Sequence, residues 1–262
     1  MNEENDARLI EAASKGDLEQ LQQLMAGEQH AETTVQRLLA AAAWKSQTPI
    51  IEFLLSKYPP GSIEEEAVRA GVYSGSIPLF SALLSADPSI INMQFDRRGT
   101  PIIVACMSQT PTEFLKFLLE AGADPNQDPD AAMVPPLAFV AAFYQDCEAV
   151  DLLLKHGARL EHSGALAGAA GRNNETMVRY LLEKGADHDD DRIDRIEPSK
   201  ADLALHIAAN KGYVGVVKIL LEHGVDPSVK DGVGNTAPQI VEETEGTGKD
   251  LSEVRKLFGR YK

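Results

Sequence analysis

The histidines have the most adaptable side chains in this sequence, because near neutral pH they can act as general bases, proton carriers or metal ligands. Six are present, at His30, His156, His162, His188, His206 and His223. His188 is followed by the carboxylates of Asp189, Asp190 and Asp191, which could gather a divalent cation. However, three adjacent carboxylates on one loop point in different directions, which is a poor cation site. We expect residues 187–197 to form an exposed acidic finger, and we predict no metal site.

The residue spacings that mark common catalytic centres are missing from the sequence. It contains no H-E-x-x-H, no glycine-rich phosphate loop, no C-x-x-C pair and no G-x-S-x-G elbow. The two cysteines, Cys106 and Cys147, fall inside helical patterns, so we expect buried thiols and not a disulfide. We therefore predict no catalytic residues, no cofactor and no enzymatic activity.

The clearest structural pattern lies in residues 202–227, DLALHIAANKGYVGVVKILLEHGVDP. Its apolar residues recur every three to four positions on both sides of a polar turn, which predicts two helices with one apolar face each. Gly224 follows the second helix, where a left-handed C-cap favours glycine. Such a helix pair is too small to bury its own apolar face, so it needs similar neighbours.

The same pattern recurs along the chain. Each second helix ends in a pair of large apolar residues, and successive pairs lie roughly 28 to 39 residues apart. The pairs are Leu24-Met25, Leu54-Leu55, Leu83-Leu84, Leu118-Leu119, Leu153-Leu154, Leu181-Leu182, Leu220-Leu221 and Leu257-Phe258. A repeat of about 33 residues built from a turn and two helices resembles the ankyrin repeat, whose signature is T-P-L-H-x-A-A followed by a leucine-rich helix and G-A-D.

The resemblance implies an all-α fold, a curved α-solenoid of about eight ankyrin repeats with degenerate capping repeats at both ends. We expect one domain over 1–262, with repeats at approximately 6–30, 34–60, 62–92, 96–127, 131–161, 163–196, 200–230 and 232–262. His206 occupies the histidine position of the signature, where the family implies a structural hydrogen bond to backbone between repeats.

Two early repeats depart from the family pattern. Residues 57–61, KYPPG, replace G-A-D in the second repeat and leave little length for a projecting hairpin. The third repeat also lacks the closing glycine and has Ala86-Asp87-Pro88 there. Ser62 and Glu65 have the spacing of a capping box, in which each side chain accepts a hydrogen bond from the free backbone N–H of the other residue. We expect a helix to begin there.

The resemblance also implies where a partner binds. In ankyrin arrays, the residues that follow each first helix, together with the hairpin tips, form a variable concave surface. Trp44 is the single tryptophan of the chain, and it sits where packing does not require one. Large, rigid, amphipathic rings are favoured at protein contacts. The predicted partner-binding residues are Trp44, Lys45, Tyr73, Phe95, Met107, Phe143, Tyr144, Arg172 and Lys211.

The chain carries 25 basic and 40 acidic residues, a formal net charge of −15. This balance argues against duplex nucleic acid and favours a basic protein or peptide as partner, although excess acid also serves solubility. The sequence lacks the basic amino-terminal residues followed by an apolar segment that mark a signal peptide. No apolar segment is long enough to span a membrane. We expect a monomer without membrane contact, in the cytoplasm or the nucleus.

Two functions of different kinds stay open at this point, beside a scaffold subunit whose partner orders the acidic finger. The first is a non-enzymatic interaction module or scaffold that holds a peptide or protein on its concave face. The second is a binding protein, or even an enzyme, that takes a small molecule or a cationic ligand in an aromatic groove, where rings attract ammonium groups by cation–π interaction. An interaction surface is open and shallow, whereas a small-ligand site is enclosed.

Overall fold

The computed structural model describes residues 3–27, 30–127, 134–186 and 203–261. The chain divides into two compact units, Met1–Gln127 and Asp128–Lys262, and each is described by itself. The acidic finger expected at 187–197 lies outside the described residues. A single domain over 1–262 stays a prediction. Helices make up the regular structure of the described part, with isolated β-bridges only at Phe95–Gly99 and Lys230–Thr236.

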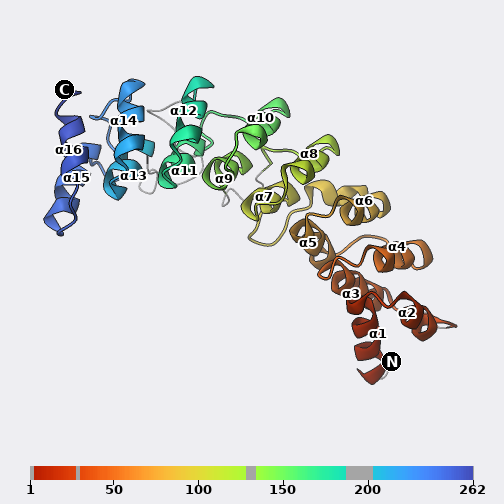
Figure 1. Ribbon diagram of the computed structural model, residues 1–262. Helices are drawn as coiled ribbons and strands as arrows, with labels where there is room; N and C mark the ends of the chain where they lie inside the picture. The colour runs from red at the N-terminus through yellow and green to blue at the C-terminus, as the bar shows by residue number, and fades with distance from the viewer. Residues whose placement is uncertain (1–2, 28–29, 128–133, 187–202, 262) are drawn as a thin grey trace. The chain divides into compact units, whose positions relative to one another are not determined.

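The first unit contains four helix pairs, and each pair has an inner and an outer helix. The inner helices are α1 (Glu3–Lys15), α3 (Glu32–Ala43), α5 (Glu65–Ser74) and α7 (Pro101–Met107). The outer helices are α2 (Leu18–Met25), α4 (Thr48–Lys57), α6 (Ile77–Ala86) and α8 (Thr112–Glu120), with a short 3-10 helix η1 (Pro88–Asn92) after α6. The inner helices form one row, with the outer helices beside them (Figure 1).

The second unit repeats this arrangement. Its inner helices are α9 (Pro136–Phe143), α11 (Ala165–Gly171), α13 (Ala204–Lys211) and α15 (Ala237–Gly246). Its outer helices are α10 (Glu148–Lys155), α12 (Glu175–Glu183), α14 (Val214–Glu222) and α16 (Ser252–Phe258). Consecutive inner helices of this unit pack on one another, as Figure 1 shows. The all-α repeat fold predicted from the sequence is confirmed.

Small residues let the inner helices approach one another closely. Ala42, Ala169 and Ala208 are fully buried, and the same positions in other repeats also carry alanine. At Gly168 a Cβ atom would lie 2.8 Å from the carbonyl oxygen of Ala138 on the neighbouring inner helix, closer than real contacts allow. Every side chain larger than glycine would therefore push α11 away from α9.

Successive repeats are joined by hydrogen bonds as well as by packing. His206 is buried at the start of α13, and its Nε2–H donates to the carbonyl oxygen of Asn235 in the next hairpin, at 3.0 Å. The structural role expected for His206 is confirmed. Gly224 follows α14 with a φ of +87°, which is the left-handed conformation expected of this C-cap.

The predicted capping box at Ser62 and Glu65 is wrong. Helix α5 begins at Glu65, and its N-cap residue Glu64 makes no side-chain cap. The buried amide of Gln36, from α3, takes over this role, donating to the carbonyl oxygen of Ser62 at 2.5 Å and accepting from the backbone N–H of Glu64 at 3.0 Å. A capping box that sequence reasoning missed is present at Thr236 and Gln239.

Side chains also replace the closing G-A-D turn where the early repeats lack it. The Tyr58 hydroxyl donates to the carbonyl oxygen of Met25 at 3.2 Å, which ties the loop after α4 to the preceding repeat. Asp87, at the end of α6, accepts from the backbone N–H of Ile63 at 3.0 Å and from the N–H and hydroxyl of Ser89 at 3.0 and 2.6 Å. These contacts fix loops that the usual glycine turn would otherwise shape.

Asp87 should make the first unit sensitive to acid. Burial acts to raise the pKa of Asp87, but the hydrogen bonds from Ser89 and Ile63 outweigh it and lower the pKa below its usual value. A carboxyl group with a lowered pKa in the folded state stabilises the fold above about pH 4, and this stability is lost as the pH falls through the folded-state pKa. We expect Asp87→Asn to cost about 1 kcal/mol of unfolding free energy near neutral pH and to reduce the loss below about pH 4.

Urea unfolding followed by circular dichroism at several pH values measures both effects. Glu52→Gln removes an exposed carboxylate from α4 in the same unit and serves as the control. An equal pH response in the wild type and in Asp87→Asn would show that the Asp87 contacts contribute nothing.

Candidate interaction surface

The largest exposed aromatic side chain belongs to Trp44, directly after α3. Its exposed fraction is 45%, whereas a core tryptophan would be covered almost completely. One face of the indole stacks on Tyr73 at the end of α5, with ring centroids 5.6 Å apart and ring planes 23° from parallel. The two rings come from neighbouring inner helices, so the stack joins two repeats.

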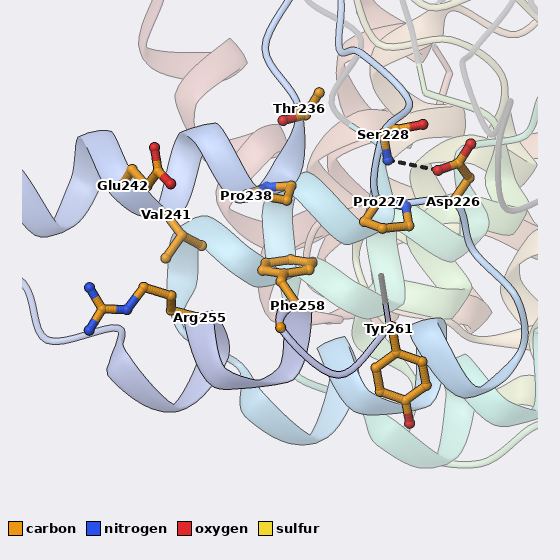
Figure 2. A pocket seen from close by; sticks show the side chains of 11 residues that line it. Asp226, Pro227, Ser228, Thr236, Pro238, Val241, Glu242, Arg255, Phe258 and Tyr261 are labelled. Atoms are coloured by element: carbon orange, nitrogen blue, oxygen red, sulfur yellow. Dashed lines mark hydrogen bonds between the residues drawn. The ribbon is translucent and has the colours of Figure 1, made fainter.

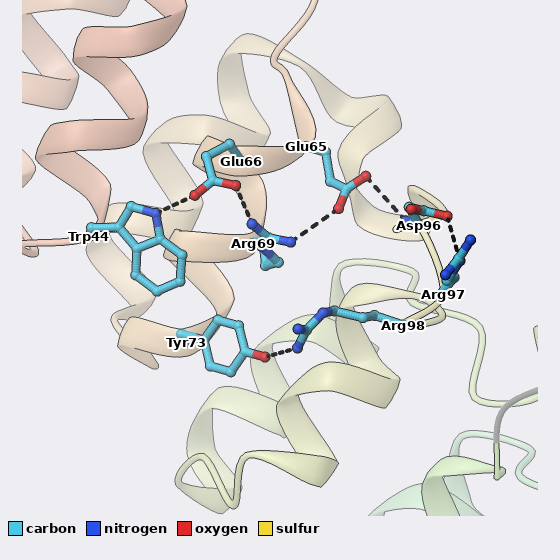
Figure 3. Close-up of polar contacts among 8 residues, drawn as sticks. All are labelled: Trp44, Glu65, Glu66, Arg69, Tyr73, Asp96, Arg97 and Arg98. Atoms are coloured by element: carbon cyan, nitrogen blue, oxygen red, sulfur yellow. Dashed lines mark hydrogen bonds and ion pairs between the residues drawn. The ribbon is translucent and has the colours of Figure 1, made fainter.

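A carboxylate fixes the indole from the side. Trp44 donates its Nε1–H to Oε1 of Glu66 at 2.7 Å, and the other oxygen of Glu66 pairs with Arg69. Arg69 also lies 3.5 Å from Glu65. Figure 3 shows this chain of contacts running from the indole along α5. A ring held by a stack and by a charge-assisted hydrogen bond has little rotational freedom left to lose on binding.

The hairpin that precedes α7 completes the cluster. Arg98 donates from Nη1 to the Tyr73 hydroxyl oxygen at 3.0 Å. The hairpin is held to α5 because Glu65 accepts from the backbone N–H of Asp96 at 3.2 Å. Three consecutive repeats therefore contribute to one surface. We call Trp44, Glu66, Arg69, Tyr73 and Arg98 the Trp44 cluster (Figure 3).

Two residues expected on the surface are buried, so these predictions are wrong. Phe95 has an exposed fraction of 0%, since the hairpin bends its ring into the core while its N–H bonds to the carbonyl oxygen of Gly99 at 2.9 Å. Tyr144 has an exposed fraction of 9% because the chain leaves α9 in an extended conformation and carries its ring inward. Lys45 is exposed next to Trp44, and Met107 is half-buried at the end of α7.

The remaining predicted residues lie in the second unit. The Arg172 guanidinium lies over the Phe143 ring, 4.4 Å from its centroid. Phe143 also stacks on Phe139 at 6.3 Å. Lys211 is exposed, and its Nζ donates to the carbonyl oxygen of Gly171 at 2.8 Å. These side chains form a second patch in which a cation already covers the aromatic ring.

Sequence reasoning missed the polar members of the Trp44 cluster. Counting back from Tyr73 in steps of four reaches Arg69 and Glu65, which lie on the same face of a helix. This spacing could have indicated an exposed charged face on α5. The contacts of Glu66 with Trp44 and of Arg98 with Tyr73 join different repeats, and no local pattern encodes them.

A pocket of about 660 Å³ lies in the second unit, between the hairpin after α14 and the last two helices (Figure 2). Its apolar lining includes Pro227, Pro238, Val241, Phe258 and Tyr261. The polar lining comes from Asp226, Ser228, Thr236, Glu242 and Arg255. Hydrogen bonds from Ser228 lower the pKa of Asp226, and Arg255 pairs with Glu245 at 3.2 Å.

The described residues offer few groups suited to catalysis or metal binding. No group of three or more histidine, cysteine, aspartate or glutamate residues in them is placed to hold a metal ion. Cys106 is a buried free thiol, as expected, whereas the free thiol of Cys147 is only half-buried directly before α10, and burial raises the pKa of both. A nucleophilic cysteine needs a lowered pKa, so neither thiol has this property. In the described ranges, no helix is long and apolar enough to span a membrane.

The paired helices define a helical repeat protein in which each pair packs against its neighbours. The family model described as ankyrin repeats (3 copies) matches residues 66–164 and 138–231, which together make up more than half of the chain. The chain therefore belongs to the ankyrin-repeat family. Ankyrin repeats are generally protein–protein interaction modules.

Relatives and solved structures agree with this family. Ankyrin repeat protein nuc-2 of Neurospora crassa is 32% identical over 165 residues, which cover 60% of this chain and 14% of that protein. The human ASB11 ankyrin repeat domain matches with a TM-score of 0.57 and 20% identity over 97% of both chains, which shows the fold alone. An ankyrin repeat domain from Acinetobacter baumannii AYE matches with a TM-score of 0.58 and 25% identity, over 76% of this chain and 98% of that one.

Trp44 should contribute little to stability if it is a surface residue. We expect Trp44→Ala to cost about 1 kcal/mol, mainly the stack on Tyr73. Phe80→Ala should cost about 3 to 5 kcal/mol, because Phe80 is fully buried and packs edge-on against Phe114. Urea unfolding followed by circular dichroism compares the two. Equal costs would make Trp44 a core residue and remove it from the surface.

Proposed function

We propose that this protein is a non-enzymatic interaction module that binds another protein or peptide on the inner-helix surface of its first unit. The supporting observation is the exposed indole of Trp44, which is fixed by Tyr73 and Glu66 at the centre of the Trp44 cluster. Aromatic side chains and arginines that are already held in place are the residues that most often dominate binding energy at protein contacts. We extend this proposal to Lys45 and Met107, which flank the cluster along the same row of helix ends.

A small-molecule or cationic-ligand site in the aromatic groove receives less support. The Trp44 and Tyr73 rings stack on each other, so they do not form facing walls around an ammonium group. Glu66, the nearest carboxylate, is already engaged by the indole N–H and by Arg69. The pocket in the second unit lies apart from these rings, and Trp44 and Tyr73 do not line it.

The proposal also covers the charge of the partner, the oligomeric state and the cellular location of the protein. The net charge of −15 favours a basic partner during long-range encounter. We propose that the protein acts as a monomer in the cytoplasm or the nucleus. The chain spans less than a fifth of the length of the curated relatives that it matches first, so their activities are not transferred to it.

Affinity capture from the source organism tests the placement of the surface. We expect the double variant Trp44→Ala/Tyr73→Ala to lose at least about tenfold in partner recovery, since two aromatic contacts at a binding centre are worth more than 1.4 kcal/mol together. The melting curve should shift only slightly, because Trp44 is exposed and Tyr73 is only half-buried.

Tyr261→Ala is the matched control. Tyr261 is an aromatic residue with an exposed fraction of 37% that lines the pocket of the second unit. Capture should be unchanged in this variant. If the double variant captures its partner as well as the wild type does, the proposed surface is wrong, and a loss in Tyr261→Ala would direct attention to the pocket.

A further inference from the structure

We propose that the Trp44 cluster recognises an acidic segment of its partner. A carboxylate of this segment pairs with Arg98, and a neighbouring proline or aliphatic residue lies on the open face of Trp44. This inference rests on the proposed function and adds the chemistry of the partner. The total charge of the chain favours a basic partner, whereas this inference concerns the charges at the contact itself, which differ from the average over the chain.

Charge is distributed unevenly within the first unit. Most of its basic residues lie on the inner helices and on the hairpin before α7, whereas Lys57 and Lys116 lie on outer helices. The basic residues of the inner helices and the hairpin are Arg8, Lys15, Arg37, Arg69, Arg97 and Arg98, and Lys45 lies in the turn after α3. The outer helices and their caps carry carboxylates at Asp17, Glu19, Glu52, Asp87, Glu113 and Glu120. The inner helices also carry carboxylates, among them Glu11, Glu32, Glu65 and Glu66, so the charge that a partner meets at the Trp44 cluster depends on which of these groups are already paired.

Two carboxylates of α5 at the cluster, Glu65 and Glu66, already have partners. Glu66 is bound by Trp44 and Arg69, and Glu65 is bound by Arg69 and by the backbone N–H of Asp96. A basic side chain arriving at the surface would have to displace these contacts. Little negative charge is therefore left to attract a cation at the Trp44 cluster itself.

The basic side chains at the edge of the cluster are less well paired with carboxylates than Arg69 is. Arg98 is exposed and donates to the neutral hydroxyl of Tyr73, so its charge is not matched by this contact. Arg97 has a side-chain exposed fraction of 92% and lies 3.9 Å from Asp96, at the limit of an ion pair. Lys45 is exposed beside the indole. A carboxylate is the group that complements this set.

The geometry of Arg98 suits a carboxylate in particular. A guanidinium group has several N–H donors in one plane, and a single donation to Tyr73 leaves most of them available. The Tyr73 hydroxyl holds the side chain, so little rotational entropy is lost when two parallel hydrogen bonds form to the incoming carboxylate.

The open face of Trp44 supplies the apolar half of the site. One face of the indole is covered by Tyr73 and its N–H is bound to Glu66, so the remaining exposure belongs largely to the other face and to the outer edge. Flat aromatic surfaces of this kind bind proline and aliphatic side chains in extended peptides. A segment that combines acidic residues with proline or leucine would use both halves.

The single tryptophan of the chain allows a direct test, because all indole fluorescence comes from Trp44. The probes are three capped peptides that differ only in charge: Glu-Glu-Pro-Leu-Glu-Glu, the same peptide with glutamine, and the same peptide with lysine. We expect only the acidic peptide to change the emission with saturation below about 1 mM, and its affinity to fall as salt is added.

Two variants with the same loss of charge separate local from general attraction. Arg98→Gln should weaken the acidic peptide about tenfold, because it removes a charge-assisted hydrogen-bond pair. Lys116→Gln, on outer helix α8 of the same unit, should leave the affinity unchanged. Arg98→Lys keeps the charge without the planar donors and should give an intermediate result.

The possible results separate this inference from the proposed function. Saturation by the lysine or glutamine peptide, equal weakening in Lys116→Gln, or no response to the acidic peptide up to about 5 mM overturns the inference. If the double variant Trp44→Ala/Tyr73→Ala still loses its captured partner in that case, the proposed function stands without the acidic segment. If capture by the double variant is also unchanged, both are wrong.

Discussion

Each helix pair of this protein buries its apolar face only by packing against the pairs beside it. The fully buried alanines of the inner helices make this possible, since a larger side chain at these positions would separate the helices. At Gly168 even one methyl group would meet the backbone of the neighbouring helix. The spacing between inner helices is therefore set by small residues, and the positions of all surface side chains depend on it.

The Trp44 cluster is a direct consequence of that spacing. Its indole follows α3, its carboxylate and phenol come from α5, and its arginine comes from the hairpin before α7. Residues that are about one repeat apart in the chain meet only because the repeats stack in register. A surface made in this way can change its chemistry through a few exposed residues while the alanines and leucines beneath it keep the fold.

The loops that follow the outer helices are held in different ways, although the helices pack alike. The second half of the chain uses the left-handed glycine of the family pattern, as at Gly224. The second and third repeats lack it. In its place, Tyr58 and the buried amide of Gln36 make hydrogen bonds to a neighbouring repeat, and Asp87 bonds to Ile63 of its own repeat. Such side chains can replace a backbone turn because they satisfy the same N–H and carbonyl groups.

The periodicity of apolar residues determined the helices, their pairing and their repeat length, because a helix that packs on a neighbour needs an apolar residue every three to four positions. It also placed Gly224 correctly after its helix, and the resemblance to the ankyrin signature did the same for His206, since both roles are local to one repeat and its next neighbour. It identified Trp44 as a surface residue because its position is one that packing does not fill.

Only the tertiary structure decided which of the expected surface residues are exposed and what surrounds them. Phe95 lies in the hairpin before α7 and Tyr144 directly after α9, and no helical periodicity describes the backbone that turns these two rings inward. The contacts of Trp44 with Glu66 and of Tyr73 with Arg98 depend on the distance and register between repeats. These are set by packing over the whole interface, so the sequence of any one repeat does not contain them.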